Sequence, residues 1–134
     1  MEKINDKIFG EMSYKHSWEK SGSFIFLDKE YKVNIIAQAY KGNEILETQQ
    51  NNYLQYQEFL DKNSDVIQAK LKNYLKEIFD INVKLDEILE PTSVIFERDN
   101  SWGILFECDC DLENGMAVFI KNGDIKVGSQ DDFL

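Results

Sequence analysis

The sequence has few cysteine, proline and histidine residues, which can cross-link a chain, break secondary structure or bind a metal. Its 134 residues include two cysteines, one proline and one histidine. Two cysteines do not make the disulfide framework of a small secreted domain. A chain of this length can bury roughly two thirds of the surface of its unfolded state, so it needs no such staple. We therefore expect one domain, 1–134, around an ordinary hydrophobic core.

Long apolar runs are also missing. Runs such as Phe24 to Leu27 and Gly103 to Phe106 have only four residues, whereas a helix that crosses a bilayer needs roughly 20. The opening "MEKINDKIFG" carries charges of both signs and lacks the apolar stretch of a signal peptide. We expect no membrane association, and we expect a protein of the bacterial cytoplasm.

Basic residues are scarce, with 15 Lys and Arg against 25 Asp and Glu and a net charge of −10. Residues 1–40 are balanced, whereas residues 91–134 carry three basic and nine acidic residues. A field of this sign repels phosphate backbones, so we expect no nucleic-acid binding. It speeds the encounter with a basic protein partner. The alternative is that the charge serves only solubility.

The spacing of apolar residues changes along the first two thirds of the chain. Alternation with period two predicts three strands, over 8–15, 23–27 and 31–40, before the break "KGN" at 41–43. Apolar residues three and four apart then predict three helices, over 47–62, 64–79 and 84–90. Pro91 forbids any extension of the last helix.

Period two returns after the proline and predicts four strands, over 92–98, 102–108, 115–121 and 124–127. The "KNGD" segment between the last two is a hairpin signal. We therefore expect an α+β fold. Its sheet would be mainly antiparallel, in βββ-ααα-ββββ order, with the helices packed on one face.

The stretch "FECDCDLENGMAV", residues 106–118, places Asp109, Asp111 and Glu113 at alternate positions before a glycine. A calcium loop needs glycine at its sixth position and glutamate at its twelfth. Counted from Asp109, these positions hold Asn114 and Ile120, and strands rather than helices flank the loop. We therefore predict no metal and no other cofactor here, with a looser Mg²⁺ or Ca²⁺ site as the alternative.

The two cysteines, Cys108 and Cys110, are interleaved with these acids. Neighbouring anions make a thiol a poor nucleophile. Zinc would need two more soft ligands, and the one histidine, His16, lies in a distant turn. We interpret Cys108 as a small core residue, and we predict no catalytic residue in the chain.

Glu107, Asp109 and Asp111 alternate opposite to an apolar face, so we expect one exposed row of negative charge. "DLENG" would then close the hairpin. The row is either a docking strip for a partner or a solvated edge. The candidate partner-binding residues are those of this row with Glu113 and, if the tail folds back, two residues of the C-terminus, Asp131 and Asp132.

The C-terminal third, "PTSVIF" and then "WGILFECDCDLENGMAVFIKNGDIKVGSQDDFL", resembles a family of small bacterial proteins of unknown function that end in a similar pattern. The matching positions are Pro91, Thr92, Ser93, Gly103, Phe106, Asp109, Asp111, Glu113, Gly115, Ala117, Val118, Asn122, Gly123, Val127, Gly128, Gln130 and Asp131. The resemblance implies a lone α+β domain. It also implies a place among the immunity-type proteins that accompany secreted polymorphic toxins, and it brings no catalytic residues.

These observations predict a non-enzymatic, acidic binding protein that neutralises a basic toxin domain. An acidic protein can cover the cationic cleft of a nuclease, because that cleft is built for phosphate. Two alternatives stay open. One is a small carboxylate-dependent, metal-using hydrolase, and the other is an intracellular adaptor without a toxin partner.

Overall fold

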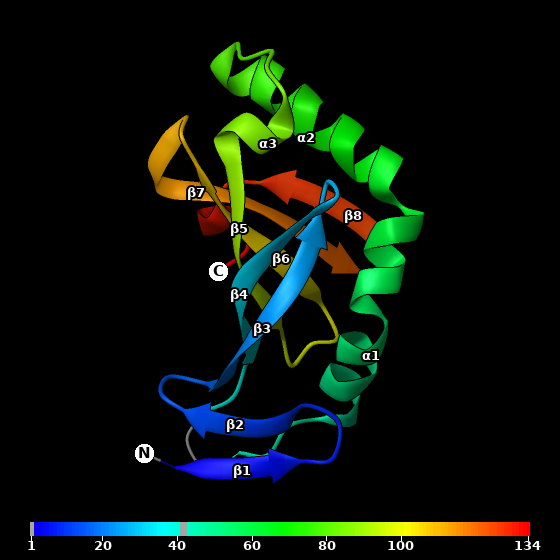
Figure 1. Ribbon diagram of the computed structural model, residues 1–134, viewed down its shortest axis with the longest axis vertical. Helices are drawn as coiled ribbons and strands as arrows, with labels where there is room; N and C mark the ends of the chain where they lie inside the picture. Colours follow the sequence, from blue (N-terminus) through cyan, green and yellow to red (C-terminus); the bar gives the residue numbers. More distant parts are fainter. Residues whose placement is uncertain (1, 41–42) are drawn as a thin grey trace.

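The computed structural model describes residues 2–40 and 43–134. Within these ranges, eight strands form one sheet whose order follows the chain, and three helices lie between the fourth and fifth strands (Figure 1). The strands are β1 (Lys3–Asp6), β2 (Gly10–Tyr14), β3 (Trp18–Phe26), β4 (Lys29–Ala37), β5 (Leu89–Phe96), β6 (Trp102–Cys108), β7 (Asp111–Lys121) and β8 (Asp124–Gly128). The helices are α1 (Glu47–Lys62), α2 (Ser64–Phe79) and α3 (Leu85–Ile88), and a 3₁₀ turn, η1 (Gln130–Asp132), follows β8.

The predicted βββ-ααα-ββββ order is wrong, because four strands precede the helices. The strand that was missed is β1, whose four residues pair with β2 but show no clear apolar alternation. The segment "HSWEKSGS", which was interpreted as a turn, supplies the first six of the nine residues of β3. The described chain is a strand-rich α+β protein with two main helices. Of the predicted break at 41–43, residues 41 and 42 lie outside the described ranges.

The sheet is mixed, which the prediction of a mainly antiparallel sheet did not foresee. β4 and β5 run parallel, from Asn34 opposite Ser93 to Ala37 opposite Phe96. The other neighbouring strands are antiparallel. Parallel neighbours need a long crossover, and the helical segment provides it by returning the chain to the end at which β4 began. The connection between the two halves of the sheet is therefore the helical layer itself.

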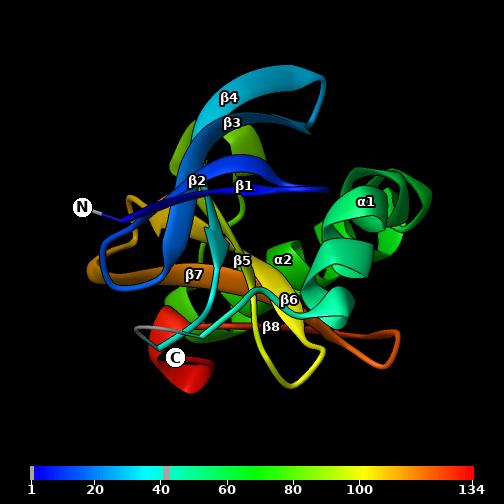
Figure 2. The same cartoon turned by 90° about the horizontal axis from the view of Figure 1, so that it is seen from below.

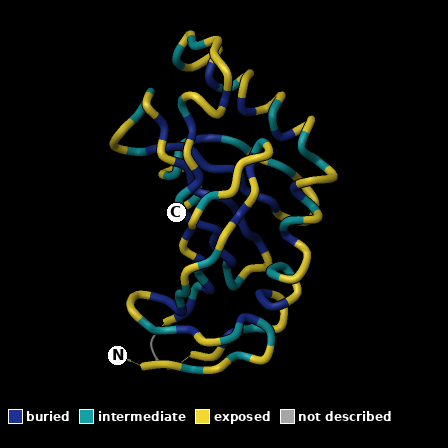
Figure 3. The backbone as a smooth tube through the Cα atoms, viewed as in Figure 1, coloured by how far each residue is buried: buried dark blue, intermediate teal, exposed yellow. Residues whose placement is uncertain are grey.

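The main core lies between the sheet and the column formed by α1 and α2 (Figures 1 and 3). The alternate residues of β4 and β6 that face this core are buried: Val33, Ile35, Ala37, Trp102, Ile104, Phe106 and Cys108. On α2, Ile67, Leu71 and Leu75 are buried, but Ile78 is 60% exposed. The C-terminal end of this helix extends past the sheet in Figure 1, and Phe79, its last residue, packs half-buried against the core.

The opposite face of the central strands is also apolar. Ile95, Leu105, Ala117 and Phe119 form a second buried cluster there. The C-terminal segment, drawn in red beside β7 in Figure 2, adds Phe133, whose ring stacks on Phe119 at 4.9 Å between centroids. β5, β6 and β7 are therefore covered on both faces, and this explains why their sequences read as nearly continuous apolar runs.

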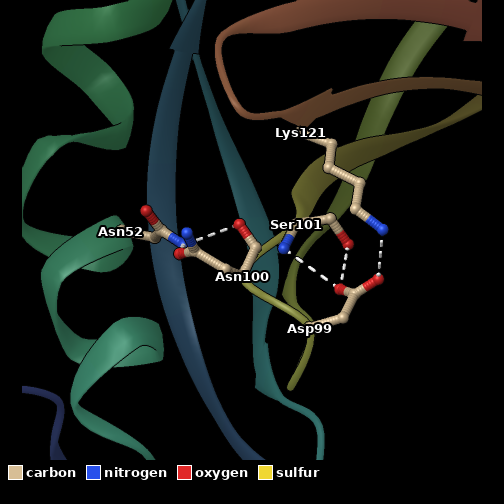
Figure 4. Close-up of polar contacts among 5 residues, drawn as sticks. All are labelled: Asn52, Asp99, Asn100, Ser101 and Lys121. Carbon is tan, nitrogen blue, oxygen red and sulfur yellow. Dashed lines mark hydrogen bonds and ion pairs between the residues drawn. The ribbon is translucent and has the colours of Figure 1, made fainter.

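The β5–β6 turn is fixed by polar contacts to two other elements (Figure 4). The Asp99 carboxylate accepts hydrogen bonds from the Ser101 hydroxyl at 2.5 Å and backbone N–H at 3.1 Å, and it pairs with Lys121 Nζ at 3.1 Å. Asn52 of α1 donates to the Asn100 side-chain oxygen at 3.0 Å. Asn100 has φ +70°, a conformation that asparagine tolerates better than most residues. The turn thus joins the sheet to α1.

These contacts make the fold's stability depend on pH. The Ser101 hydroxyl, followed by the Ser101 N–H and Lys121, lowers the pKa of Asp99 from 3.8 to about 2. A lowered folded-state pKa adds stability that is present above pH 3.8 and is lost as the pH falls through about 2. Asp99→Asn should therefore lower the free energy of unfolding at neutral pH, and the difference from the native chain should shrink towards pH 2.

Urea unfolding of both chains across this pH range measures the difference. Asp124→Asn, in the neighbouring β7–β8 hairpin, is the charge-matched control. A difference between Asp99→Asn and the native chain that stays constant from neutral pH to below pH 2 would show that the Asp99 carboxylate does not stabilise this turn.

Candidate functional site

The predicted row of acids is divided by a turn. β6 ends at Cys108, and the chain reverses through Asp109 and Cys110 to start β7 at Asp111. Asp111 therefore lies opposite Cys108 on the neighbouring strand, rather than three residues beyond Cys108 on the same strand. The prediction assumed that extended chain continued to residue 111, so it placed the acids on one side of one strand.

"DLENG" does not close the hairpin as predicted, because it belongs to β7. Its residues 112–115 bulge out between the pairs Phe106–Met116 and Cys108–Asp111, so that they face Glu107 alone. Gly115 has φ +61° and lies close to the Phe106 carbonyl, where a Cβ would meet that oxygen at 2.4 Å. A glycine is thus needed where the bulged chain rejoins the sheet.

Glu107 and Asp109 lie on a pocket of about 300 Å³ at the ends of β4, β5 and β6. Three further acids line it: Asp86 and Glu87 of α3, and Glu90 of β5. All five carboxylates belong to exposed residues. We call this the acidic pocket; its remaining lining residues are Lys29, Tyr31, Ile88 and Leu89.

Strand pairing explains why these acids converge. Glu90 lies directly opposite Glu107, and the Asp109 N–H continues the pairing by donating to the Ile88 carbonyl at 3.0 Å. Two like charges opposite each other on neighbouring strands destabilise a sheet. Glu90 and Glu107 also line a second hollow of about 310 Å³, together with Lys32 and Asn34 of β4. The pair therefore lies at the centre of a hollowed surface.

No carboxylate of the acidic pocket forms an ion pair within 4.0 Å with any residue of 2–40 or 43–134. Lys29 lines the pocket and Lys32 lines the neighbouring hollow, but neither makes such a contact in the described chain. The negative charge of this surface is therefore only partly compensated by the protein.

Sequence reasoning missed Asp86, Glu87 and Glu90 as site residues. The signal was present as three acids in "LDEILE", immediately before Pro91. The register that places Glu90 opposite Glu107 cannot be read from the sequence, because it is set by the pairing of β5 with β6.

The remaining predicted acids lie elsewhere on the C-terminal segment. Asp111 accepts a hydrogen bond from the Asn114 N–H at 3.2 Å, and Asp132 accepts one from the Ser129 N–H at 3.1 Å. Burial raises the pKa of Tyr74 on α2, and the charges of Asp132 and Asp111 raise it further. Neither of these two carboxylates lines the acidic pocket. Glu113 and Asp131 are exposed.

The tail does fold back onto the sheet, which was the condition attached to Asp131 and Asp132. The Gln130 side chain donates to the Phe106 carbonyl at 3.0 Å, next to the stacking of Phe133 on Phe119. The predicted site residues thus form a pair in the acidic pocket, Glu107 and Asp109, and a separate C-terminal group. These are two surfaces rather than one row.

The two cysteines are joined by a disulfide across the turn, with their Cα atoms 5.2 Å apart. This bond was not predicted from the sequence. Cys108 is buried in the core, as predicted, while Cys110 is half-buried. The C-x-C spacing alone gave no indication, because only a tight reversal at Asp109 brings the two Cβ atoms into bonding range. The bond holds Asp109 of the acidic pocket between its two ends.

Other signals for chemistry are weak in the part of the chain that the structure describes. His16 is exposed in the β2–β3 turn. Residues 2–40 and 43–134 contain no group of three or more His, Cys, Asp or Glu side chains placed to hold a metal ion. None of the described helices is both long and apolar enough to cross a membrane.

Comparisons with known proteins add no relative. No protein-family model, no curated protein and no solved structure matches the chain. The resemblance to a family of small bacterial proteins therefore stays a prediction.

The disulfide leads to a direct test. Protein purified without reductant should show no reactive thiol after denaturation and two after reduction. Cys110→Ser should fold, because Cys108 keeps its buried place, but it should lose about 1–2 kcal/mol of stability with the closure of this short loop. A native chain that yields two thiols without reduction would contradict the bond.

With reductant present, the native chain and Cys110→Ser should unfold at similar denaturant concentrations.

Proposed function

We propose that this chain is a non-enzymatic, acidic binding protein whose acidic pocket docks a basic protein partner, of the kind found in a toxin domain with a cationic cleft. The observation that carries the proposal is the convergence of five carboxylates from α3, β5, β6 and the β6–β7 turn on one pocket. The toxin identity of the partner rests on the sequence resemblance, and the basic character rests on the pocket.

The arrangement costs free energy in the isolated protein. Glu90 and Glu107 repel each other across neighbouring strands, and the described chain supplies no ion-pair partner for either. A lysine or arginine from a partner would relieve this repulsion where the field is strongest. A surface that is unfavourable alone and favourable when a cation is placed on it suits docking better than it suits solubility.

A protein partner fits this surface better than a small cation does. The carboxylates come from four separate elements and are all exposed, and Glu90 and Glu107 extend into a second hollow that includes Lys32 and Asn34. Contacts over such a width need several basic groups held at fixed separations, which a folded basic domain provides. The metal-using hydrolase and the adaptor without a toxin partner stay alternatives, and no described contact favours either.

The proposal predicts slower association when the pocket loses charge. Glu107→Gln with Asp109→Asn should reduce the association rate about tenfold at low salt and much less at high salt, because exposed charges act mainly on encounter. The fold should be retained, since the Glu107 change removes a repulsion. The measurement is binding kinetics with a basic protein domain, taken first from any toxin-like protein that a neighbouring gene encodes.

The control is Glu113→Gln with Asp131→Asn, which removes the same charge from two exposed residues outside the acidic pocket. It should change the rate by less than about twofold. Equal slowing by both variants would mean that only net charge matters. Slowing by the control alone would place the interface on the C-terminal segment and overturn the assignment to the acidic pocket.

A further inference from the structure

Another pocket, of about 360 Å³ and distinct from the two hollows described above, lies on the helical side of the sheet. We call it the hairpin pocket, because the tip of the β3–β4 hairpin forms one of its walls. The opposite wall is the junction where α1 ends at Lys62 and α2 begins at Ser64 (Figure 1). Its floor is the core face of β6 and β7, represented by Ile104, Phe106 and Val118. It is separate from the acidic pocket.

Two features keep this pocket open. At the junction, Asn63 ends α1 by donating through both its backbone and its side chain to the Phe59 carbonyl, at 3.0 and 2.8 Å. The hairpin tip is attached to α1 by Gln57, whose side chain accepts from the Ile25 N–H at 3.2 Å and donates to the Ile25 carbonyl at 3.3 Å. The walls are thus held by hydrogen bonds rather than by packing into the gap.

The interior of the hairpin pocket is apolar. Phe24, Phe26 and Ile67 line it together with the floor residues, and each of these side chains is less than 9% exposed. Pockets that take small molecules have volumes of roughly 300–1,000 Å³ and predominantly apolar linings with a few polar groups at fixed places. The hairpin pocket has a volume in this range, and nine of the thirteen described residues that line it are apolar.

The polar groups at its mouth favour a cation. Asp28 and Asp61 line the pocket, and both are exposed. No Lys, Arg or His is among the described residues that line it. Gln68 donates to the Ser64 hydroxyl at 2.9 Å, which leaves the Gln68 carbonyl oxygen as a further acceptor. The start of α2 carries about half a positive charge, and the two carboxylates outweigh it.

The hairpin tip is also strained at this wall. Leu27 has φ +52° and Asp28 has φ +65°. Two-residue hairpin turns of this shape usually contain Asn and Gly, because a leucine in the left-handed region costs about 1–2 kcal/mol. Leu27 nevertheless occupies the first of these positions, is half-buried and lines the pocket. The strained backbone therefore places an apolar side chain where a ligand would touch it.

We propose that the hairpin pocket binds a small amphipathic molecule with an ammonium group. Its apolar body would lie against Phe24, Phe26 and the floor of β6 and β7. Its ammonium group would lie at the mouth, within reach of the carboxylates of Asp28 and Asp61. This site is independent of the acidic pocket and of the protein partner proposed for it.

The test uses three probes with the same apolar body and different head groups: octylamine, octanol and octanoate. Each is titrated into the full chain below its micellar concentration, and binding is followed by amide chemical shifts. We expect saturable shifts at residues 24–28 and 60–68, with octylamine the tightest probe. Asp28→Asn with Asp61→Asn should weaken octylamine about fivefold and octanol less than twofold.

Two more variants separate this proposal from general effects. Asp65→Asn, an exposed acid at the start of α2 that does not line the pocket, should leave octylamine binding unchanged. Leu27→Asn suits the left-handed turn but removes an apolar wall, so it should weaken all three probes while the chain stays folded. Tighter binding of octanoate, equal losses for Asp65→Asn and the double variant, or non-saturable shifts with every probe would overturn the proposal.

Discussion

The fold depends on one buried amide, the side chain of Gln49. It is 0% exposed and uses both of its ends. Its nitrogen donates to the Gln38 carbonyl at 2.8 Å and to the Phe96 carbonyl at 2.9 Å, and its oxygen accepts from the Leu46 N–H at 2.8 Å. One side chain thereby joins the chain just after β4, the end of β5 and the start of α1. A buried group left without its partner costs about 1–3 kcal/mol, so this residue cannot be replaced by an apolar one without loss.

Both candidate sites follow from that junction. Because α1 is fixed at the ends of β4 and β5, the helical segment crosses over the sheet and β5 pairs with β4 in parallel. The pairing brings Glu90 of β5 beside the start of β4, where Lys29 lies, and β6 then places Glu107 opposite Glu90. The same crossover lays α1 along β3, which creates the hairpin pocket. The tip of the β3–β4 hairpin contributes to both sites: Asp28 lines the hairpin pocket, and Lys29 lines the acidic pocket.

The features that depend on residues close in sequence, such as the bounds of a helix, were predicted correctly. The two main helices have the predicted bounds, and the apolar faces of β4 and β6 are buried. The predicted strand order was wrong because β1 has no apolar alternation. The one parallel pair, β4 with β5, was not predicted, because a helical connection can join strands of either relative direction. The single acidic row was wrong because the chain reverses immediately after the predicted end of β6 and starts β7 at Asp111, four residues before the predicted start of that strand. Glu90 was missed as a site residue because it joins the acidic pocket only by pairing with Glu107, which is distant in sequence.

The most direct test of this account is the stability of Gln49→Leu, compared with Gln55→Leu at an exposed position of the same helix. Both changes remove an amide and add apolar surface. Only the first leaves the Leu46 N–H without its acceptor and takes one of two donors from each of the Gln38 and Phe96 carbonyls. Urea unfolding should show a loss of about 2 kcal/mol or more for Gln49→Leu, and a change within about 0.5 kcal/mol for Gln55→Leu. Equal stability of the two variants would contradict the central place given to Gln49.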